Sequence, residues 1–119
     1  NYSDYHAHLG CLPGISTISE PLGDRSTRWL TVLEIDSDSF GATPVEVRQF
    51  LETQGIESRP LWKPMHMQPI FSGCRMLGGD VCEQLFNQGL CLPSGSALTT
   101  KDRDRVIRAV IASPVSLAQ

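Results

Sequence analysis

Three closely spaced prolines constrain this chain more than any other feature of its sequence. They lie in residues 59–71, which read RPLWKPMHMQPIF, at Pro60, Pro64 and Pro69. Each proline lacks a backbone donor and biases the preceding residue toward extended geometry, which excludes an α-helix and the centre of a sheet. We therefore predict that residues 59–71, called the proline loop below, form a shaped loop on a more regular scaffold.

The proline loop carries side chains that suit an anionic ligand containing a ring. We predict substrate-binding roles for four of them: Arg59, Trp62, Lys63 and His66. The cations match phosphate oxygens, the indole offers a stacking face, and imidazole can donate or accept a hydrogen bond. Taken singly, a tryptophan at a core edge or a histidine between methionines is more often structural. The prediction depends on their grouping on one rigid loop, which lowers the entropy lost on binding.

Length and charge limit the class of protein. A chain of 119 residues is the size of one domain, so we expect residues 1–119 to share a single core. The net charge is -3 and the basic residues are scattered, which does not favour nucleic acid as a partner. No apolar run approaches the roughly 20 residues of a membrane helix. We expect a cytoplasmic protein without membrane or nucleic-acid contacts.

The cysteines and the known catalytic motifs give no chemistry of their own. Cys11, Cys74, Cys82 and Cys91 lack the Cys-x-x-Cys spacing of zinc sites, and without a secretion signal they are not expected to form disulfides. Because Cys11, Cys82 and Cys91 adjoin leucine or valine, we predict that they are small buried hydrophobes. We assign no catalytic residue, no cofactor-binding residue and no metal ligand to this chain.

In the first half of the chain, periodicity and punctuation predict two helices and two strands. The predicted elements are a helix over residues 2–9, loop from CLPGIS to residue 27, a strand over residues 28–36, a helix over residues 44–54 and a short strand over residues 55–58. The strand over residues 28–36 has apolar side chains on both faces, with Trp29, Leu33 and Ile35 on one, and is predicted to be central. Thr43 and Glu46 predict a capping box for the second helix.

In the second half, Asp80 and Glu83 are predicted to cap a helix whose Val81, Leu85 and Phe86 point inward. A strand over residues 90–92, a turn over residues 93–96 and a final helix with Thr99 as its N-cap follow. We expect Val106, Ile107, Val110 and Ile111 to be buried, and Pro114 to end the helix. Together these elements predict an α+β domain with helices on one face of a small, mostly antiparallel sheet.

Two long strings of the sequence resemble a known family. ESRPLWKPMHMQPIF and GGDVCEQLFNQGLCLPSGSALT, together with RWLTVLEID and the LPGI turn, are similar to the C-terminal segment of DegT/StrS-family aminotransferases, which use pyridoxal phosphate and act on nucleotide sugars. The resemblance extends over about residues 5–111. It is strongest to the branch that aminates 4-keto sugars carried on uridine diphosphate.

This resemblance implies that residues 1–119 are the small C-terminal domain of a fold-type I aminotransferase, whose cofactor-binding large domain lies outside this chain. The implied reaction transfers an amino group from an amino acid, with glutamate as the expected donor, to a keto sugar nucleotide, in a homodimer. The lysine that holds pyridoxal phosphate belongs upstream, so Lys63 and Lys101 are not assigned that role. Arg59, Trp62, Lys63 and His66 occupy the loop that closes over the nucleotide sugar in the family.

Two alternatives stay open. The parent protein is either an aminotransferase or a deoxysugar dehydratase of the same family, in which the cofactor lysine is replaced. The chain could instead be a free-standing nucleotide-binding or interaction module. A first helix packed on the chain's own core would favour the free-standing module, whereas a detached helix with an exposed apolar face would favour a missing partner domain.

Overall fold

The computed structural model describes residues 1–78 and 80–117. Its elements in chain order are α1 (Tyr2–Leu9), β1 (Ile15–Thr17), β2 (Thr31–Ile35), α2 (Ser37–Phe40), α3 (Pro44–Thr53), β3 (Arg59–Pro60), the 3-10 turns η1 (Met65–Met67) and η2 (Pro69–Phe71), α4 (Val81–Gln88), β4 (Gly89–Leu92) and α5 (Thr100–Leu117). Within the described residues, no helix has both the length and the apolar character needed to cross a membrane.

The sheet has the strand order β1-β2-β4-β3, and each neighbouring pair is antiparallel. β2 lies between β1 and β4, which confirms the prediction of a central strand. Its residues alternate between full and partial burial, with Thr31, Leu33 and Ile35 on the more buried side. The α+β class and the antiparallel sheet are therefore confirmed.

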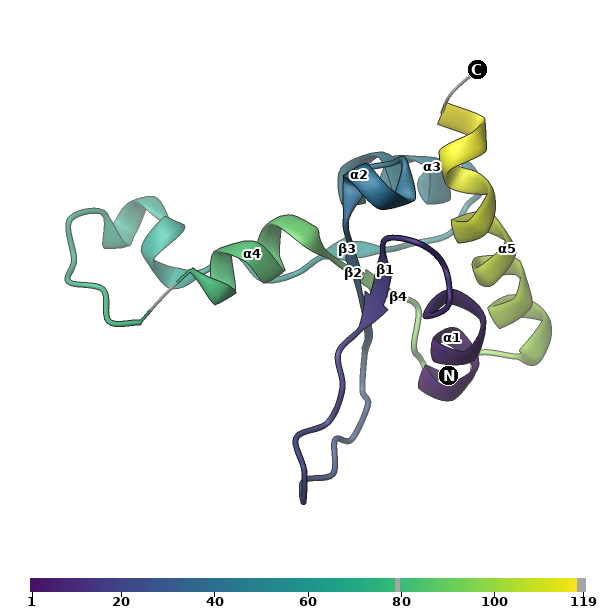
Figure 1. Ribbon diagram of the computed structural model, residues 1–119, viewed down its shortest axis with the longest axis horizontal. Coiled ribbons are helices and arrows are strands. Elements are labelled where there is room, and N and C mark those ends of the chain that lie inside the picture. The colour runs from purple at the N-terminus through teal and green to yellow at the C-terminus, as the bar shows by residue number, and fades with distance from the viewer. Residues whose placement is uncertain (79, 118–119) are drawn as a thin grey trace.

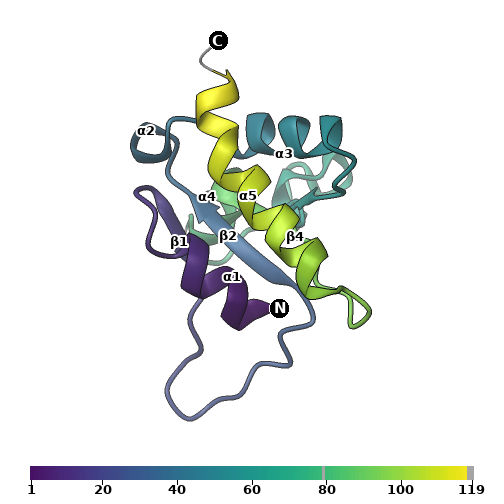
Figure 2. The same ribbon diagram turned by 90° about the vertical axis from the view of Figure 1, so that its right-hand side faces the viewer.

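One face of the sheet is covered by α1, α3 and α5, which lie together on the right of Figure 1 and in front of the sheet in Figure 2. α5 contacts both α1 and α3, so the three helices form one layer. The core between this layer and the sheet consists of buried apolar side chains from both: Tyr5, Leu9, Ile15, Leu33, Ile35, Ala42, Val47, Leu51, Ile56, Leu90, Leu92, Val106, Ile107 and Val110.

α4 departs from this arrangement. Figure 1 shows it on the opposite side of the sheet, within a long excursion of residues 61–88 that reaches away from the helix layer. We call residues 61–88 the arm. None of the core residues comes from the described part of the arm, whereas Met65, Ile70 and Leu77 on it are strongly exposed. The expectation of helices on one face therefore holds for α1, α3 and α5 but not for α4.

Local capping signals formed as predicted around α3. The Thr43 side chain accepts from the Glu46 backbone N–H at 3.2 Å, and the Glu46 carboxylate accepts from the Thr43 N–H at 2.8 Å. The Thr43 hydroxyl also donates to the Glu46 carboxylate, at 2.7 Å. The two bonds that the carboxylate accepts hold the pKa of Glu46 below its ordinary value, with the bond from the Thr43 backbone as the larger cause. Because both partners lie within one helical turn, the sequence alone is enough to specify this helix start.

Three local predictions in the first half of the chain were wrong. The CLPGIS segment is not all loop, because Ile15 begins β1 and pairs with Ile35. Residues 55–58 form no strand; the edge strand β3 begins at Arg59, the first residue of the predicted proline loop. The short helix α2, a single turn capped by the Asp36 side chain, was not predicted. Each of these short elements is set by a neighbour distant in sequence or by one cap.

Several side chains predicted to be inward are exposed. Trp29 precedes β2 and is 68% exposed, Val81 begins α4 and is 66% exposed, and Ile111 is 44% exposed. Cys91 is buried on β4 as expected, and burial raises the pKa of its thiol. Cys11 and Cys82 are exposed, so their predicted burial was wrong.

Pro114 does not end the last helix, which continues to Leu117. A proline inside a helix leaves the carbonyl four residues earlier without its usual donor, here the carbonyl of Val110. The buried Ser113 hydroxyl donates to that carbonyl at 2.7 Å. Ser113 thus replaces the lost donor, which explains why the local proline rule failed here.

The first helix packs on the chain's own core. Tyr5 and Leu9 of α1 are completely buried, and the Tyr5 hydroxyl donates to the Pro93 carbonyl at 2.8 Å. α1 is therefore not a detached helix with an exposed apolar face. Among the described residues, the most exposed apolar side chains are instead Leu22 on the loop between β1 and β2, which is fully exposed, and Ile70 and Leu77 on the arm.

Candidate functional site

The proline loop begins as an edge strand and continues as two 3-10 turns. Arg59 and Pro60 pair with Cys91 and Leu90 of β4, and no further strand lies beyond β3 among the described residues. Pro64 precedes η1, and Pro69 opens η2. The exclusion of an α-helix and of a central strand is confirmed, because an edge strand tolerates a proline that an inner strand does not.

Arg59 lies at the start of the loop and is already paired. Its Nη2 is 2.6 Å from the Glu57 Oε1, and both side chains are more than 70% exposed. Ion pairs this exposed to water contribute about 0–1 kcal/mol. The guanidinium can therefore exchange Glu57 for an incoming anion at little cost.

Trp62 lies against a second tryptophan that the sequence had placed in the core. The rings of Trp62 and Trp29 have centroids 5.6 Å apart and are tilted by 31°, and both side chains are about two-thirds exposed. These are the two tryptophans of the chain. Trp62 of the proline loop and Trp29 together form an exposed aromatic pair, a surface on which a planar ring can pack.

Lys63 and His66 lie farther along the arm and do not line the cavity described below. Lys63 is exposed, and its carbonyl accepts from the Gln68 side chain at 3.2 Å, which braces the loop internally. His66 is half-buried, and its Nε2 lies 2.7 Å from Oε1 of Glu83 on α4. The predicted capping role of Glu83 was wrong, and Asp80 makes no side-chain cap bond either.

A cavity of about 1070 Å³ lies where β3 and β4 meet α3 and α5. Arg59 and Trp62 both line it, so the structure brings together two of the four predicted site residues. Its lining is made up of charged side chains from three elements and apolar groups from the sheet edge: Leu30, Arg48, Glu52, Gly55, Ile56, Glu57, Ser58, Arg59, Pro60, Leu61, Trp62, Cys91, Leu92, Pro93, Leu98, Asp102, Arg105 and Val106.

Arg48 and Arg105 are cavity residues that sequence reasoning missed. Arg48 on α3 lies 3.9 Å from Glu52, and Arg105 on α5 donates to the Gln54 carbonyl. Nothing in the local sequence of either helix marks these residues, because only the packing of α3 on α5 brings them to the same cavity. With Arg59 they give the cavity three guanidinium groups from three elements.

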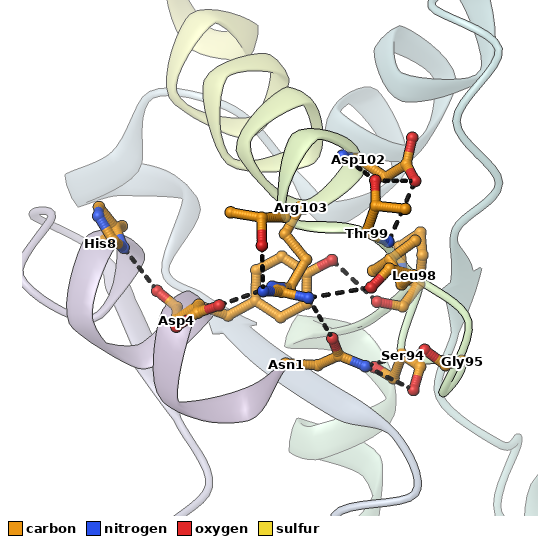
Figure 3. A network of polar contacts seen from close by, with 12 residues as sticks. Asn1, Asp4, His8, Ser94, Gly95, Leu98, Thr99, Asp102 and Arg103 are labelled. Atoms are coloured by element: carbon orange, nitrogen blue, oxygen red, sulfur yellow. Dashed lines mark hydrogen bonds and ion pairs between the residues drawn. The ribbon is translucent and has the colours of Figure 1, made fainter.

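The turn over residues 93–96, whose Pro93 lines the cavity, is held by hydrogen bonds from α1 and β2, and Figure 3 shows its contact with Asn1. The Asn1 side chain donates to the Ser94 carbonyl at 2.9 Å, and the Thr31 N–H donates to the Ser94 hydroxyl at 2.8 Å. The Tyr5 hydroxyl donates to the neighbouring Pro93 carbonyl. The carbonyls of Pro93 and Ser94 and the Ser94 hydroxyl are therefore engaged in the fold.

Arg103 ties the same region to α1. Its Nε donates to Asp4 at 2.6 Å, and its Nη1 donates to the Leu98 carbonyl at 3.0 Å and to Asn1 at 3.3 Å (Figure 3). One turn away, Thr99 and Asp102 form the N-terminal cap of α5, and the Thr99 hydroxyl bond lowers the pKa of Asp102. α1, the turn and the start of α5 therefore form one bonded unit.

Comparison with known proteins places this fold in a family. Residues 1–111 match the DegT/DnrJ/EryC1/StrS aminotransferase family. The chain is 40% identical over 114 residues to EpsN of Bacillus subtilis strain 168, whose name assigns it to the pyridoxal phosphate-dependent aminotransferases; the match covers 92% of this chain and 29% of EpsN. It is 33% identical over 89 residues to GDP-perosamine synthase of Caulobacter vibrioides, covering 75% of this chain and 24% of that protein.

Solved structures agree at the level of the fold. The aminotransferase TlmJ from Streptoalloteichus hindustanus superposes with a TM-score of 0.82 at 20% identity, over 99% of this chain and 31% of TlmJ. The chain thus spans less than a third of the length of each of these relatives. Since the family match covers nearly all of the described residues, the chain belongs to the DegT/DnrJ/EryC1/StrS aminotransferase family.

Proposed function

We propose that this chain is the C-terminal domain of a cytoplasmic, pyridoxal phosphate-dependent aminotransferase that acts on nucleotide sugars. In this proposal the parent enzyme transfers an amino group from an amino acid, with glutamate as donor, to a keto sugar nucleotide, and works as a homodimer. The observation that carries the proposal is the family match over residues 1–111, supported by the 40% identity to EpsN. The name of GDP-perosamine synthase, a second relative, supports a nucleotide sugar as the substrate class.

The residues of this chain do not fit a covalent site for pyridoxal phosphate. The cofactor acts as an electron sink when a lysine amine holds it as a Schiff base. Lys63 and Lys101 are the lysines of the chain, and both are exposed and lie outside the cavity lining. An amine that is to act as a nucleophile at neutral pH needs desolvation or a cationic neighbour. We therefore place the cofactor site in the remainder of the parent protein.

The role proposed for this chain is to hold the nucleotide sugar. Arg59 and Trp62 would contact its diphosphate and a ring, with Arg48 and Arg105 also lining the same cavity. Guanidinium groups suit phosphate because they present paired donors in a plane. Lys63, which lies outside the cavity on the arm, would contact a phosphate only when the arm faces the reacting centre.

A free-standing nucleotide-binding module is the second candidate. The packing of Tyr5 and Leu9 into the core favours it, because α1 needs no further domain to cover it. The strongly exposed Ile70 and Leu77 on the arm favour a domain that is covered by another surface. The two candidates differ in whether the 119-residue chain binds a nucleotide diphosphate by itself.

Kinetics of the parent enzyme test the proposal. Arg59→Ala and Lys63→Ala should each raise KM for the keto sugar nucleotide about tenfold, the effect of losing one charge-assisted hydrogen bond, while the cofactor absorbance stays unchanged. Arg108→Ala and Lys101→Ala, at exposed positions on α5 outside this cavity, are the matched controls. Unchanged KM values in both loop variants would remove Arg59 and Lys63 from the site. Formation of an amino sugar separates an aminotransferase from a family dehydratase.

The isolated chain supplies the second test. Both tryptophans lie in one pair, so quenching of intrinsic fluorescence reports on ligand binding at the proline loop. Under the leading proposal, uridine, thymidine and guanosine diphosphates bind the 119-residue chain weakly, and borohydride traps no pyridoxal phosphate on it. Micromolar nucleotide binding by the chain alone would favour the free-standing module, and a trapped Schiff base would contradict the placement of the cofactor.

A further inference from the structure

The described part of the arm contributes no residue to the hydrophobic core, so contacts within the arm matter for its shape. Met65, Ile70, Leu77 and Val81 on it are exposed. Figure 1 shows the arm extending away from the helix layer. Bonds within the arm therefore help to position the side chains that it presents, beside the contacts of α4 with β2 and β4 and of Trp62 with Trp29.

The strongest such bond joins the two halves of the arm. His66 on η1 and Glu83 on α4 meet with 2.7 Å between Nε2 and Oε1, and their side chains are 24% and 39% exposed. Among the described residues, this is the one ion pair with both partners in the arm. The loop and the helix are thus fixed relative to each other at a partly buried contact.

The chemistry of the partner fixes which nitrogen of His66 is free. An ionised carboxylate has no hydrogen to give, so Nε2 must be the donor in this bond. The neutral imidazole then carries its hydrogen on Nε2 and keeps a lone pair on Nδ1. Among the described residues, no hydrogen-bond partner is found for Nδ1.

We propose that Glu83 is a positioning residue for His66: it takes Nε2, sets the orientation of the ring, and leaves Nδ1 as the atom that meets the substrate. The inference rests on the proposed function, in which the proline loop contacts a nucleotide sugar. It assigns Glu83 a role that is neither a helix cap nor a direct ligand contact. An acidic partner on one imidazole nitrogen that orients the other toward its target is a recurring arrangement in protein sites.

Nuclear magnetic resonance of the imidazole nitrogens tests the geometry directly. The chain has three histidines, so His66→Asn identifies the His66 signals by their loss. In the 119-residue chain, neutral His66 should carry its hydrogen on Nε2, and Glu83→Gln should bring in the tautomer with the hydrogen on Nδ1, because an amide can also donate. Glu83→Asp should restore part of the original pattern. Asp80→Asn is the control, since the Asp80 side chain makes no cap bond at α4. The proposal would be overturned if neutral His66 carried its hydrogen on Nδ1 in the unsubstituted 119-residue chain, or if Glu83→Gln left the spectrum unchanged.

Kinetics of the full-length enzyme test the consequence. Glu83→Gln and His66→Asn should each raise KM for the keto sugar nucleotide about tenfold, which corresponds to about 1.4 kcal/mol, with kcat within about twofold. If the two residues act as one unit, the double variant should be no worse than the poorer single variant. Additive effects would mean that Glu83 does not act through His66 and would overturn the proposal.

The two measurements separate this inference from the proposed function. If the tautomer signature is present but His66→Asn leaves KM unchanged, the pair only braces the arm and the positioning role is overturned, while amino transfer by the parent enzyme stands. If the parent enzyme forms no amino sugar, the proposed function fails whatever the imidazole spectrum shows.

Discussion

Tyr5 offers a test of the fold that can be worked out from one buried hydroxyl. The residue is completely buried, its hydroxyl donates to the Pro93 carbonyl at 2.8 Å, and burial raises its pKa to about 12, partly offset by the nearby Arg103. The perturbation is Tyr5→Phe, which removes the hydroxyl and leaves the ring. Tyr2→Phe is the matched control, because Tyr2 is the other tyrosine and its hydroxyl makes only longer bonds of 3.3 and 3.4 Å.

The expected effect changes sign with pH. Near neutral pH the unsubstituted chain should be more stable than Tyr5→Phe by about 1 kcal/mol, the net value of one hydrogen bond. A tyrosine in the unfolded chain ionises near pH 10, whereas folded Tyr5 keeps its proton until about pH 12. The unfolded state therefore binds fewer protons in this window, and stability falls as pH rises. At about pH 11 the loss is about 1.4 kcal/mol, enough to cancel the advantage of the hydroxyl.

Urea unfolding at several pH values from about 7 to 11 measures this difference. The free energy of unfolding of the unsubstituted chain minus that of Tyr5→Phe should fall, as the pH rises, from about 1 kcal/mol to about zero or slightly below. The same difference for Tyr2→Phe should stay nearly constant, so other groups that ionise in this range cancel. A constant difference for Tyr5→Phe across the whole range would refute the reasoning that burial raises the pKa of this hydroxyl.

Two further predictions concern the joints of the fold. Arg103→Ala should destabilise the chain by about 3 kcal/mol, because it removes a charge-assisted bond to Asp4 and three further bonds. Arg108→Ala on the same helix is the control and should change the stability by less than about 0.5 kcal/mol. A fall in melting temperature of less than about 4 °C for Arg103→Ala would contradict this prediction. Gly89→Ala should destabilise the chain by about 2–3 kcal/mol, since a Cβ there would collide with the Leu61 side chain. The amide hydrogens of α4 and the rest of the arm should then exchange faster with solvent. Unchanged exchange rates would show that the space between Gly89 and Leu61 can accept a methyl group.

The elements that sequence reasoning predicted well are those whose cause is local. Thr43 and Glu46 cap α3 within one turn, and the prolines of residues 59–71 exclude an α-helix and a central strand wherever the rest of the chain lies. In some places where prediction failed, a distant partner is involved. Glu83 makes no cap bond at its own helix, and its carboxylate instead meets His66, 17 positions earlier.

Some failures had a local cause that the rule did not include. Pro114 fits inside α5 because the preceding Ser113 supplies the missing donor to Val110. The candidate site shows both limits. Arg59 and Trp62 were found from the composition of one segment, while Arg48 and Arg105 reach the same cavity only because α3 and α5 pack together.

The exposure of the site residues bears on how the substrate would be held. The Arg59 side chain is 78% exposed and Trp62 is 65% exposed. At a separation of 4 Å, two opposite charges attract by about 1 kcal/mol in water, but by about 4 kcal/mol at the effective dielectric constant near a protein surface. A guanidinium that is open to solvent therefore gains most of its affinity for a diphosphate only when a second surface covers both. The proposed large domain would supply that surface, and the exposed Ile70 and Leu77 on the arm are positions where it would pack. On this reasoning Arg59→Ala should weaken nucleotide binding far more in the full-length enzyme than in the 119-residue chain.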